Sequence, residues 1–224
     1  MRRLVFIVEG KSEVQFVNQL LIPYLSSKDG LQGIPMHAQQ LVSNRKKIIH
    51  GGSMSFGKFS NDVRNVAHSG DVLVTTMIDF FRLPTDFPGY ATDSKKIDSI
   101  ERAVRDALSS VISPSVFLPY IQRHEFETLL FASMDGFASI IDDSKALRAL
   151  EHIVKGYPNP EDIDGGAETA PSKRIGHIFN YEKGVDSLMA LRAIPIDAIR
   201  ARCPRFDHWL HELEDGLKSG FFSF

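Results

Sequence analysis

The sequence predicts an α/β protein with a parallel sheet of about four strands flanked by helices, followed by a helical C-terminal part. Short apolar runs alternate with amphipathic helical patterns over the first 135 residues, and helical patterns fill most of the remainder. The apolar runs lack polar alternation, which is typical of strands covered on both faces. We therefore expect an α/β core over residues 1–135 and a helical extension over residues 136–224 that packs on it.

The first elements are a strand and a helix joined by a short turn. Leu4–Val8 is an apolar run followed by Glu9 and Gly10, and an apolar helical stripe then continues to about Leu25. Ser12 with Gln15 fits a capping box that would open this helix. The remaining expected elements are a strand near Met36–Val42, a basic loop over Asn44–Gly57, a helix over Lys58–His68, a strand over Asp71–Asp79, a loop over Phe81–Thr92, a helix over Ser94–Ser110, a strand over Ser115–Ile121 and a last helix near Phe206–Leu217.

The overall charge is close to neutral but unevenly distributed. The 224 residues include 26 Lys and Arg against 28 Asp and Glu, a formal net charge of −2. Residues 1–57 carry seven basic and three acidic residues, so this part could attract phosphate locally. The overall balance excludes polyanion binding driven by net charge alone and predicts weak binding of long nucleic acid by the isolated chain.

The cysteine content and the length of the apolar runs indicate in which cellular compartment the protein is expected. The single cysteine, Cys203, excludes an internal disulfide and a cysteine zinc cluster. The apolar run after Arg3 ends at Glu9, too early for a secretion signal, and no run reaches the roughly 18 residues of a membrane span. We therefore expect a cytoplasmic protein with no membrane partner.

Acidic residues stand at the ends of three of the expected strands. Glu9 follows the first strand, Asp79 ends the third and Glu125 follows the fourth. Open parallel sheets hold their reactive sites at this edge, and several carboxylates there repel one another unless a cation lies among them. Oxygen ligands favour Mg²⁺ or Mn²⁺, which suits phosphodiester chemistry. A single acid after a strand is usually a solvated loop residue, so the prediction rests on the three acids together.

Further candidate residues surround these three acids. Glu13 and His124 could orient the metal ligands or replace one of them, and Glu127 could join the catalytic group, although an acid in a first helical turn or on a helix surface needs no such role. Phosphate contacts are expected from the basic residues Lys11, Arg45, Lys46, Lys47, Lys173, Arg174 and Lys183. No P-loop motif is present, and short basic runs are often merely solvated.

An ordered series of motifs carries a family resemblance. Val8–Glu13 after the first strand, Asp79 after a later strand and Arg123–Glu127 after the fourth together resemble the Toprim fold. More closely, the chain is similar to a Toprim-like bacterial family catalogued as a domain of unknown function, with relatives among OLD-type and anti-phage nuclease effectors. The similarity extends through Asp79–Pro84, Phe87–Gly89, Glu168–Arg174 and Cys203–Asp207 and so covers nearly the whole length.

The resemblance implies a Mg²⁺-dependent nuclease acting on DNA or RNA, transfer RNA included, with some relatives working beside a partner ATPase in anti-phage defence. Toprim enzymes place a glutamate after the first strand and an Asp-x-Asp pair after the third; Glu9 and Asp79 match, but position 81 is Phe. Under this resemblance Glu9 binds metal or acts as general base and Asp79 binds metal. Asp86 or Glu125 would supply the missing ligand, which leaves one and two metal ions as alternatives.

Two other functions are compatible with the sequence. The phenylalanine at position 81 keeps open a non-catalytic module that binds a partner ATPase or nucleic acid. Phosphoryl transfer on a small molecule is the third alternative. If the protein is a nuclease, its near-neutral charge predicts that engagement depends on a partner, on a homo-oligomer or on a structured substrate.

Overall fold

The chain divides into two compact units in the computed structural model, which describes residues 2–41, 54–163 and 166–223. Unit 1 comprises Met1–Ile121 and Leu210–Phe224, and unit 2 comprises Gln122–Trp209. This division differs from the expected boundary after residue 135, because a change from strands to helices in a sequence does not show which segments pack together. The division into a core over residues 1–135 and an extension over residues 136–224 stays a prediction. Arg45, Lys46 and Lys47 lie outside the described residues.

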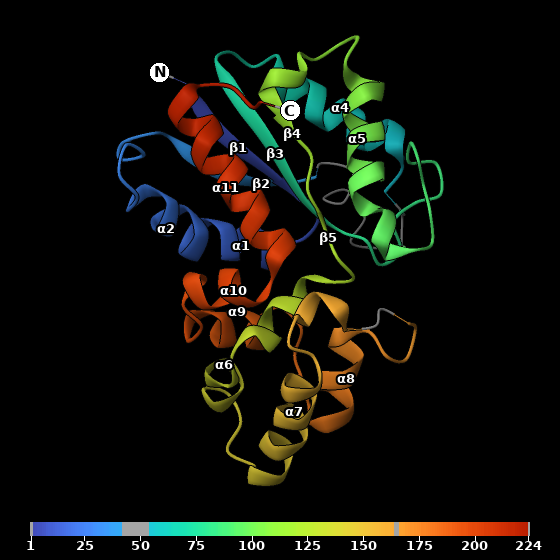
Figure 1. The fold of residues 1–224 in the computed structure, drawn as a ribbon, viewed down its shortest axis with the longest axis vertical. Coiled ribbons are helices and arrows are strands. Elements are labelled where there is room, and N and C mark those ends of the chain that lie inside the picture. The colour runs from blue at the N-terminus through green and yellow to red at the C-terminus, as the bar shows by residue number, and fades with distance from the viewer. Residues whose placement is uncertain (1, 42–53, 164–165, 224) are drawn as a thin grey trace. The chain divides into compact units, whose positions relative to one another are not determined.

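A parallel sheet forms the centre of unit 1 (Figure 1). Its strands are β1 (Arg3–Val8), β2 (Met36–Gln40), β3 (Val72–Asp79) and β4 (Phe117–Leu118) in the order β2-β1-β3-β4, with β5 (Ile121–Gln122) paired to β3. The pairings of β1 with β2, β1 with β3 and β3 with β4 are all parallel. The predicted α/β fold with a parallel sheet is therefore confirmed.

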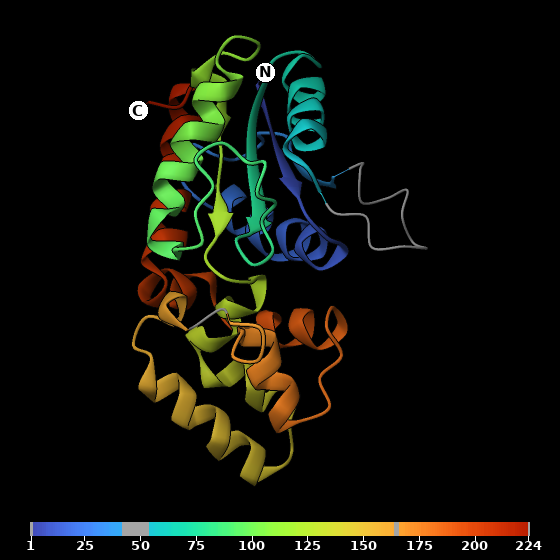
Figure 2. The ribbon, with the colours of Figure 1, turned by 90° about the vertical axis from the view of Figure 1, so that its right-hand side faces the viewer.

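Helices cover both faces of this sheet. They are α1 (Lys11–Phe16), the π-helical turn η1 (Val17–Leu21), α2 (Ile22–Ser26), α4 (Phe56–Ala67), the 3-10 turn η2 (Ser94–Lys96), α5 (Ile97–Leu108), the 3-10 turn η3 (Pro114–Val116) and the end of α11 (Pro204–Ser219). Figures 1 and 2 show α4 and α5 on one side of the sheet and α1, α2 and α11 on the other.

Alternate residues of the strands enter different parts of the core. Val5 and Ile7 of β1 belong to a buried cluster with residues of α4 and α5, such as Phe59 and Val104. Phe6 lies between them in sequence, is also fully buried, and is not part of that cluster. Both faces of β1 are thus removed from water, which explains why the sequence shows an unbroken apolar run there.

The start of α1 differs from the prediction. The residue that precedes its first turn is Gly10, not Ser12, and no side chain caps it. The expected capping box at Ser12 is therefore wrong. Only Glu9 and Gly10 separate the strand from the helix, and a Cβ atom on Gly10 would lie 2.7 Å from Oε2 of Glu13. Glycine at this position lets the buried Glu13 side chain approach the backbone closely.

Unit 2 is helical, as predicted for the C-terminal part of the chain. Its elements are the 3-10 segment η4 (Phe126–Ala132), α6 (Met134–Ala138), α7 (Ser144–Gly156), the 3-10 turn η5 (Pro160–Asp162), α8 (Pro171–Ile178), α9 (Val185–Arg192), α10 (Ile196–Arg202) and the beginning of α11. Aromatic pairs lie in its core, with the ring centroids of Phe131 and Phe137 at 5.2 Å. In the described parts of both units, no helix has the length and apolarity needed to cross a membrane.

Candidate active site

The sheet of unit 1 reverses its strand order at β1. The chain runs from β1 to β2 on one side and then returns to β3 on the other side of β1. The connections leaving β1 and β3 therefore diverge, and open α/β proteins bind ligands in the crevice that such a switch point creates. Glu9 directly follows β1, and Asp79 is the last residue of β3. Val8 and Met77 are partners in the register of these strands, so the two acids stand at neighbouring strand ends.

Three strands hold Glu9 in place. The backbone N–H of Glu9 donates to the carbonyl oxygen of Met77 on β3 at 3.3 Å, and Nε2 of Gln40 on β2 donates to the carbonyl oxygen of Glu9 at 3.2 Å. The side chain turns toward β3, where Oε2 accepts a hydrogen bond from the backbone N–H of Asp79 at 3.2 Å. The structure thus brings Glu9 and Asp79 together, as the strand-end argument predicts.

The donor set of this pair suits a hard divalent cation. Both side chains present carboxylate oxygens and both residues are half-buried. Mg²⁺ typically uses one or two protein carboxylates and keeps several waters, so two acids from adjacent strands fit its demands. No group of three or more His, Cys, Asp or Glu side chains arranged to hold a metal occurs among the described residues.

The other predicted residues of unit 1 have different surroundings. Glu13 is buried against Gly10, and Lys11 is exposed at the first position of α1. Asp86, expected as a substitute metal ligand, accepts a hydrogen bond at Oδ2 from the backbone N–H of Phe56 at 2.9 Å. Phe56 is the first residue of α4, so Asp86 satisfies one of the amides that a helix start leaves unpaired.

Glu125 belongs to unit 2 and stabilises a helix start there. The residue is buried, and its Oε2 accepts a hydrogen bond from the backbone N–H of Ser172 at 3.0 Å. Ser172 is the second residue of α8, where a negative charge is favoured by the helix dipole and by unpaired amides. Because Glu9 and Asp79 belong to unit 1, the predicted meeting of Glu125 with them stays a prediction.

Glu127 is the most deeply buried of the predicted acids. Its exposed fraction is 0%, so the alternative that it lies on a helix surface is wrong. The Nζ atom of Lys183 lies 3.0 Å from its Oε2, and the hydroxyl of Tyr181 donates to its Oε1 at 3.4 Å. Burial raises the pKa of Glu127, and the charge of Lys183 opposes this rise. Lys183, predicted to contact phosphate, is thus engaged within unit 2.

A family model described as "Domain of unknown function (DUF4276)" matches residues 8–214. The chain belongs to this family. No curated protein and no solved structure matches it. The DUF4276 region includes the Glu9–Asp79 pair of unit 1 as well as Glu125 and Glu127 of unit 2.

The other motif residues in the second half of the DUF4276 region have different surroundings. Arg174 donates from Nε to the carbonyl oxygen of Thr169 at 2.6 Å, and its guanidinium lies 5.6 Å from the centroid of the Tyr157 ring. Lys173 beside it is exposed. His124 is buried and has a backbone φ of 65°, a conformation that is uncommon for residues other than glycine.

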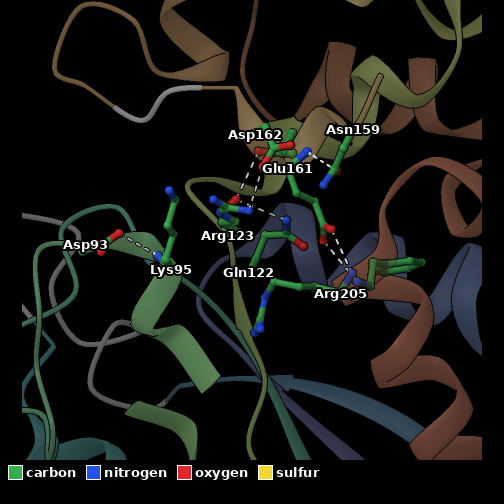
Figure 3. A network of polar contacts seen from close by, with 10 residues as sticks. Asp93, Lys95, Gln122, Arg123, Asn159, Glu161, Asp162 and Arg205 are labelled. Atoms are coloured by element: carbon green, nitrogen blue, oxygen red, sulfur yellow. Dashed lines mark hydrogen bonds and ion pairs between the residues drawn. The ribbon is translucent and has the colours of Figure 1, made fainter. Parts of the chain in front are cut away.

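Sequence reasoning missed Glu161, which organises the start of α11 (Figure 3). This fully buried carboxylate accepts hydrogen bonds from the backbone N–H groups of Arg205 at 2.9 Å and Phe206 at 3.1 Å. Burial raises the pKa of Glu161, and the two amides oppose that rise. Close by in Figure 3, Nη1 of Arg123 pairs with Oδ1 of Asp162 at 2.9 Å. Pro204 indicates in the sequence that a helix starts there. No sequence pattern indicates that Glu161 accepts hydrogen bonds from the first backbone amides of that helix.

Gln40 is the other missed residue. It lies at the end of β2 and fixes the carbonyl of Glu9. A glutamine side chain is uncharged, so nothing in the sequence distinguishes Gln40 as part of a site. Its role becomes visible only because β1 and β2 are neighbours in the sheet.

Proposed function

We propose that this DUF4276 protein is a Mg²⁺- or Mn²⁺-dependent nuclease that hydrolyses phosphodiester bonds of DNA or RNA. The observation that carries the proposal is the hydrogen bond from the Asp79 amide to the Glu9 carboxylate across the switch point of the sheet. The Toprim-like motifs around the same two residues support phosphodiesters as the substrate class.

Glu9 and Asp79 would hold the cation in this proposal. A bound divalent ion polarises a phosphoryl oxygen and orients the attacking group. The protein holds these groups rigidly. The Asp79 amide restricts the direction of the Glu9 carboxylate, and the hydrogen bonds of the Glu9 backbone with Gln40 and Met77 fix the position of that backbone. Lys11, exposed at the start of α1 two residues after Glu9, would bind a neighbouring phosphate.

Glu125 and Glu127 have structural roles in this proposal. Glu125 accepts the Ser172 amide, and Glu127 lies beside Lys183 and Tyr181, so each already has a partner within unit 2. The ligand set is therefore two carboxylates and solvent, which favours one metal ion over two. An anti-phage role beside a partner ATPase is a further proposal that rests on the family resemblance.

The second candidate function is a non-catalytic module that binds a partner ATPase or nucleic acid. It is favoured by the residue that stands where Toprim enzymes have their second aspartate. Phe81 occupies that position, and the guanidinium carbon of Arg82 lies 5.1 Å from its ring centroid. An aromatic ring and a cation replace a carboxylate there, which weakens the electrostatic attraction for a second metal ion.

A cleavage assay on the full chain separates these functions. Labelled DNA, RNA and transfer RNA are incubated with Mg²⁺, Mn²⁺ or chelator and with three variants. These are Glu9→Gln, Asp79→Asn and, as a surface control, Glu151→Gln, whose side chain pairs with the exposed Lys155 on α7. The proposal expects metal-dependent cleavage that falls at least about 100-fold in the first two variants, because even residues that merely orient metal ligands cost 10- to 100-fold. Circular dichroism verifies folding.

Two other outcomes would contradict the nuclease proposal. Metal-independent binding without cleavage would support the docking module. Nucleotide hydrolysis without strand scission would support phosphoryl transfer on a small molecule.

A further inference from the structure

A polar pocket lies in unit 1 between the edge strand β2 and helix α4. Its volume is about 300 Å³. Val5 and Val66 provide apolar contacts, and the polar lining consists of Arg3, His37, Gln39, Asp62, Asn65 and Ser69. Val5 and His37 are neighbours in the register of β1 and β2, so the strands supply one wall and α4 the other.

This pocket is separate from the Glu9–Asp79 pair. Arg3 begins β1 and Glu9 follows its end, so the two residues are six positions apart along an extended strand, or about 20 Å. The contacts described above for Glu9 come from Met77, Gln40 and Asp79, and these three residues do not line the pocket. An occupant of the pocket would therefore act independently of the proposed nuclease chemistry.

Arg3 is the feature that indicates an anionic occupant. Its Nη2 donates to the carbonyl oxygen and the hydroxyl of Ser69, at 3.1 and 2.6 Å. Its Nε is buried and makes no hydrogen bond within the described part of the chain. A buried donor without an acceptor is rare and costly, and a missing ion or water is one of its ordinary explanations. The amides of Gln39 and Asn65 add neutral donors to the same pocket.

Asp62 determines which anion can enter. It and Arg3 are the charged residues of the lining, and His37 is the other titratable one. An oxyanion with no proton, such as sulfate, would be repelled by the Asp62 carboxylate. A phosphate group has a second pKa of about 6 and can keep a proton, which it would donate to Asp62 while its other oxygens accept from Arg3.

We propose that this pocket binds a phosphate group, as inorganic phosphate or as a phosphate monoester, between Arg3 and Asp62. The pocket is larger than the ion alone requires, so a monoester fits as well. Burial and the charge of Arg3 lower the pKa of His37 when the pocket holds no anion. A bound phosphate next to both residues reverses the sign of the local field and raises that pKa. Binding therefore weakens as pH rises, because both His37 and the phosphate lose protons.

Nuclear magnetic resonance of the full chain tests the proposal through the ring protons of His37, assigned with the variant His37→Gln. Inorganic phosphate, sulfate and a nucleoside 5′-monophosphate are titrated at constant ionic strength. The proposal expects a saturable shift with phosphate or with the monophosphate and none with sulfate. Tighter binding of the monophosphate identifies a monoester as the natural occupant, and equal or weaker binding identifies inorganic phosphate.

Three variants make the test specific. Arg3→Gln should weaken binding at least about tenfold, since a hydrogen bond between charged groups contributes about 1.5 kcal/mol or more. Arg64→Gln, an exposed arginine of α4 bonded to Asn61, should change nothing. Asp62→Asn should let sulfate bind, a gain that no folding defect can mimic. The proposal is wrong if neither phosphate probe shifts His37 saturably, or if sulfate binds the unmodified chain as well as phosphate does.

Discussion

Replacing Glu101 with glutamine should remove a large pH dependence from the stability of the protein. Glu101 lies on α5, and its Oε1 accepts a hydrogen bond from the backbone N–H of Ile121 at 2.7 Å. Burial raises its pKa from 4.5 to about 8; the Ile121 amide and Arg105 oppose this rise and Glu212 adds to it. The folded protein therefore keeps this carboxyl protonated at pH values where the unfolded chain has released the proton.

The sign and size of the effect follow from that difference. Between pH 4.5 and 8 the folded state holds one more proton than the unfolded state, so the free energy of unfolding decreases as pH rises, by about 1.4 kcal/mol per pH unit. Over the whole window the loss is at most about 5 kcal/mol. Part of the residue remains exposed, so water that reaches the ionised carboxylate makes the actual loss smaller.

Urea unfolding at pH 5, 7 and 9, followed by circular dichroism, measures this loss. Glu101→Gln keeps an oxygen that can accept the Ile121 amide but does not titrate, so it should gain stability relative to the unmodified protein as pH rises. Glu212→Gln should reduce the dependence, because it removes a neighbouring negative charge. Parallel stability curves for the unmodified protein and Glu101→Gln would show that Glu101 does not cause the pH dependence.

Three further substitutions test the packing around the motifs. Glu161→Ala should lower the free energy of unfolding by about 2–4 kcal/mol, because it leaves two backbone amides at the start of α11 without acceptors, and Glu161→Gln should cost less in the same denaturant titration. Arg202→Lys should speed amide hydrogen exchange at the end of α7, because one ammonium cannot replace a guanidinium that donates to carbonyls at positions 154, 157 and 158. Gly10→Ala should lower the free energy of unfolding in the same denaturant titration, because its Cβ atom would force the buried Glu13 carboxylate to move, whereas Gly57→Ala, with open space around its Cβ position, should not.

Strand ends could be predicted from the sequence because their signal is local. An apolar run without alternation, such as Leu4–Val8, identifies a buried parallel strand, and the acid that follows it must then lie at the carboxyl edge of the sheet. The pairing of Glu9 with Asp79 follows from this rule together with the adjacency of β1 and β3. The helical nature of unit 2 follows in the same way from its periodicity.

The roles of the remaining motif residues could not be predicted because they depend on contacts distant in sequence. Glu125 contacts an amide 47 positions away, and Glu161 contacts two amides more than 40 positions away. A buried acid that accepts backbone amides and an acid that ligates metal look alike in a sequence, because both follow apolar segments. The sequence predicts a strand over Ser115–Ile121, but nothing in it indicates that the chain passes from unit 1 to unit 2 at Gln122.

Binding of Mn²⁺ measured by electron paramagnetic resonance tests whether Glu9 and Asp79 hold a metal ion. The signal of free Mn²⁺ decreases on binding, so a titration counts sites without requiring activity. We expect one site per chain that is lost in both Glu9→Gln and Asp79→Asn and kept in Glu125→Gln and Glu151→Gln. Mn²⁺ binding that persists in both Glu9→Gln and Asp79→Asn, or that is lost only in Glu125→Gln, would contradict the assignment of the metal to the ends of β1 and β3.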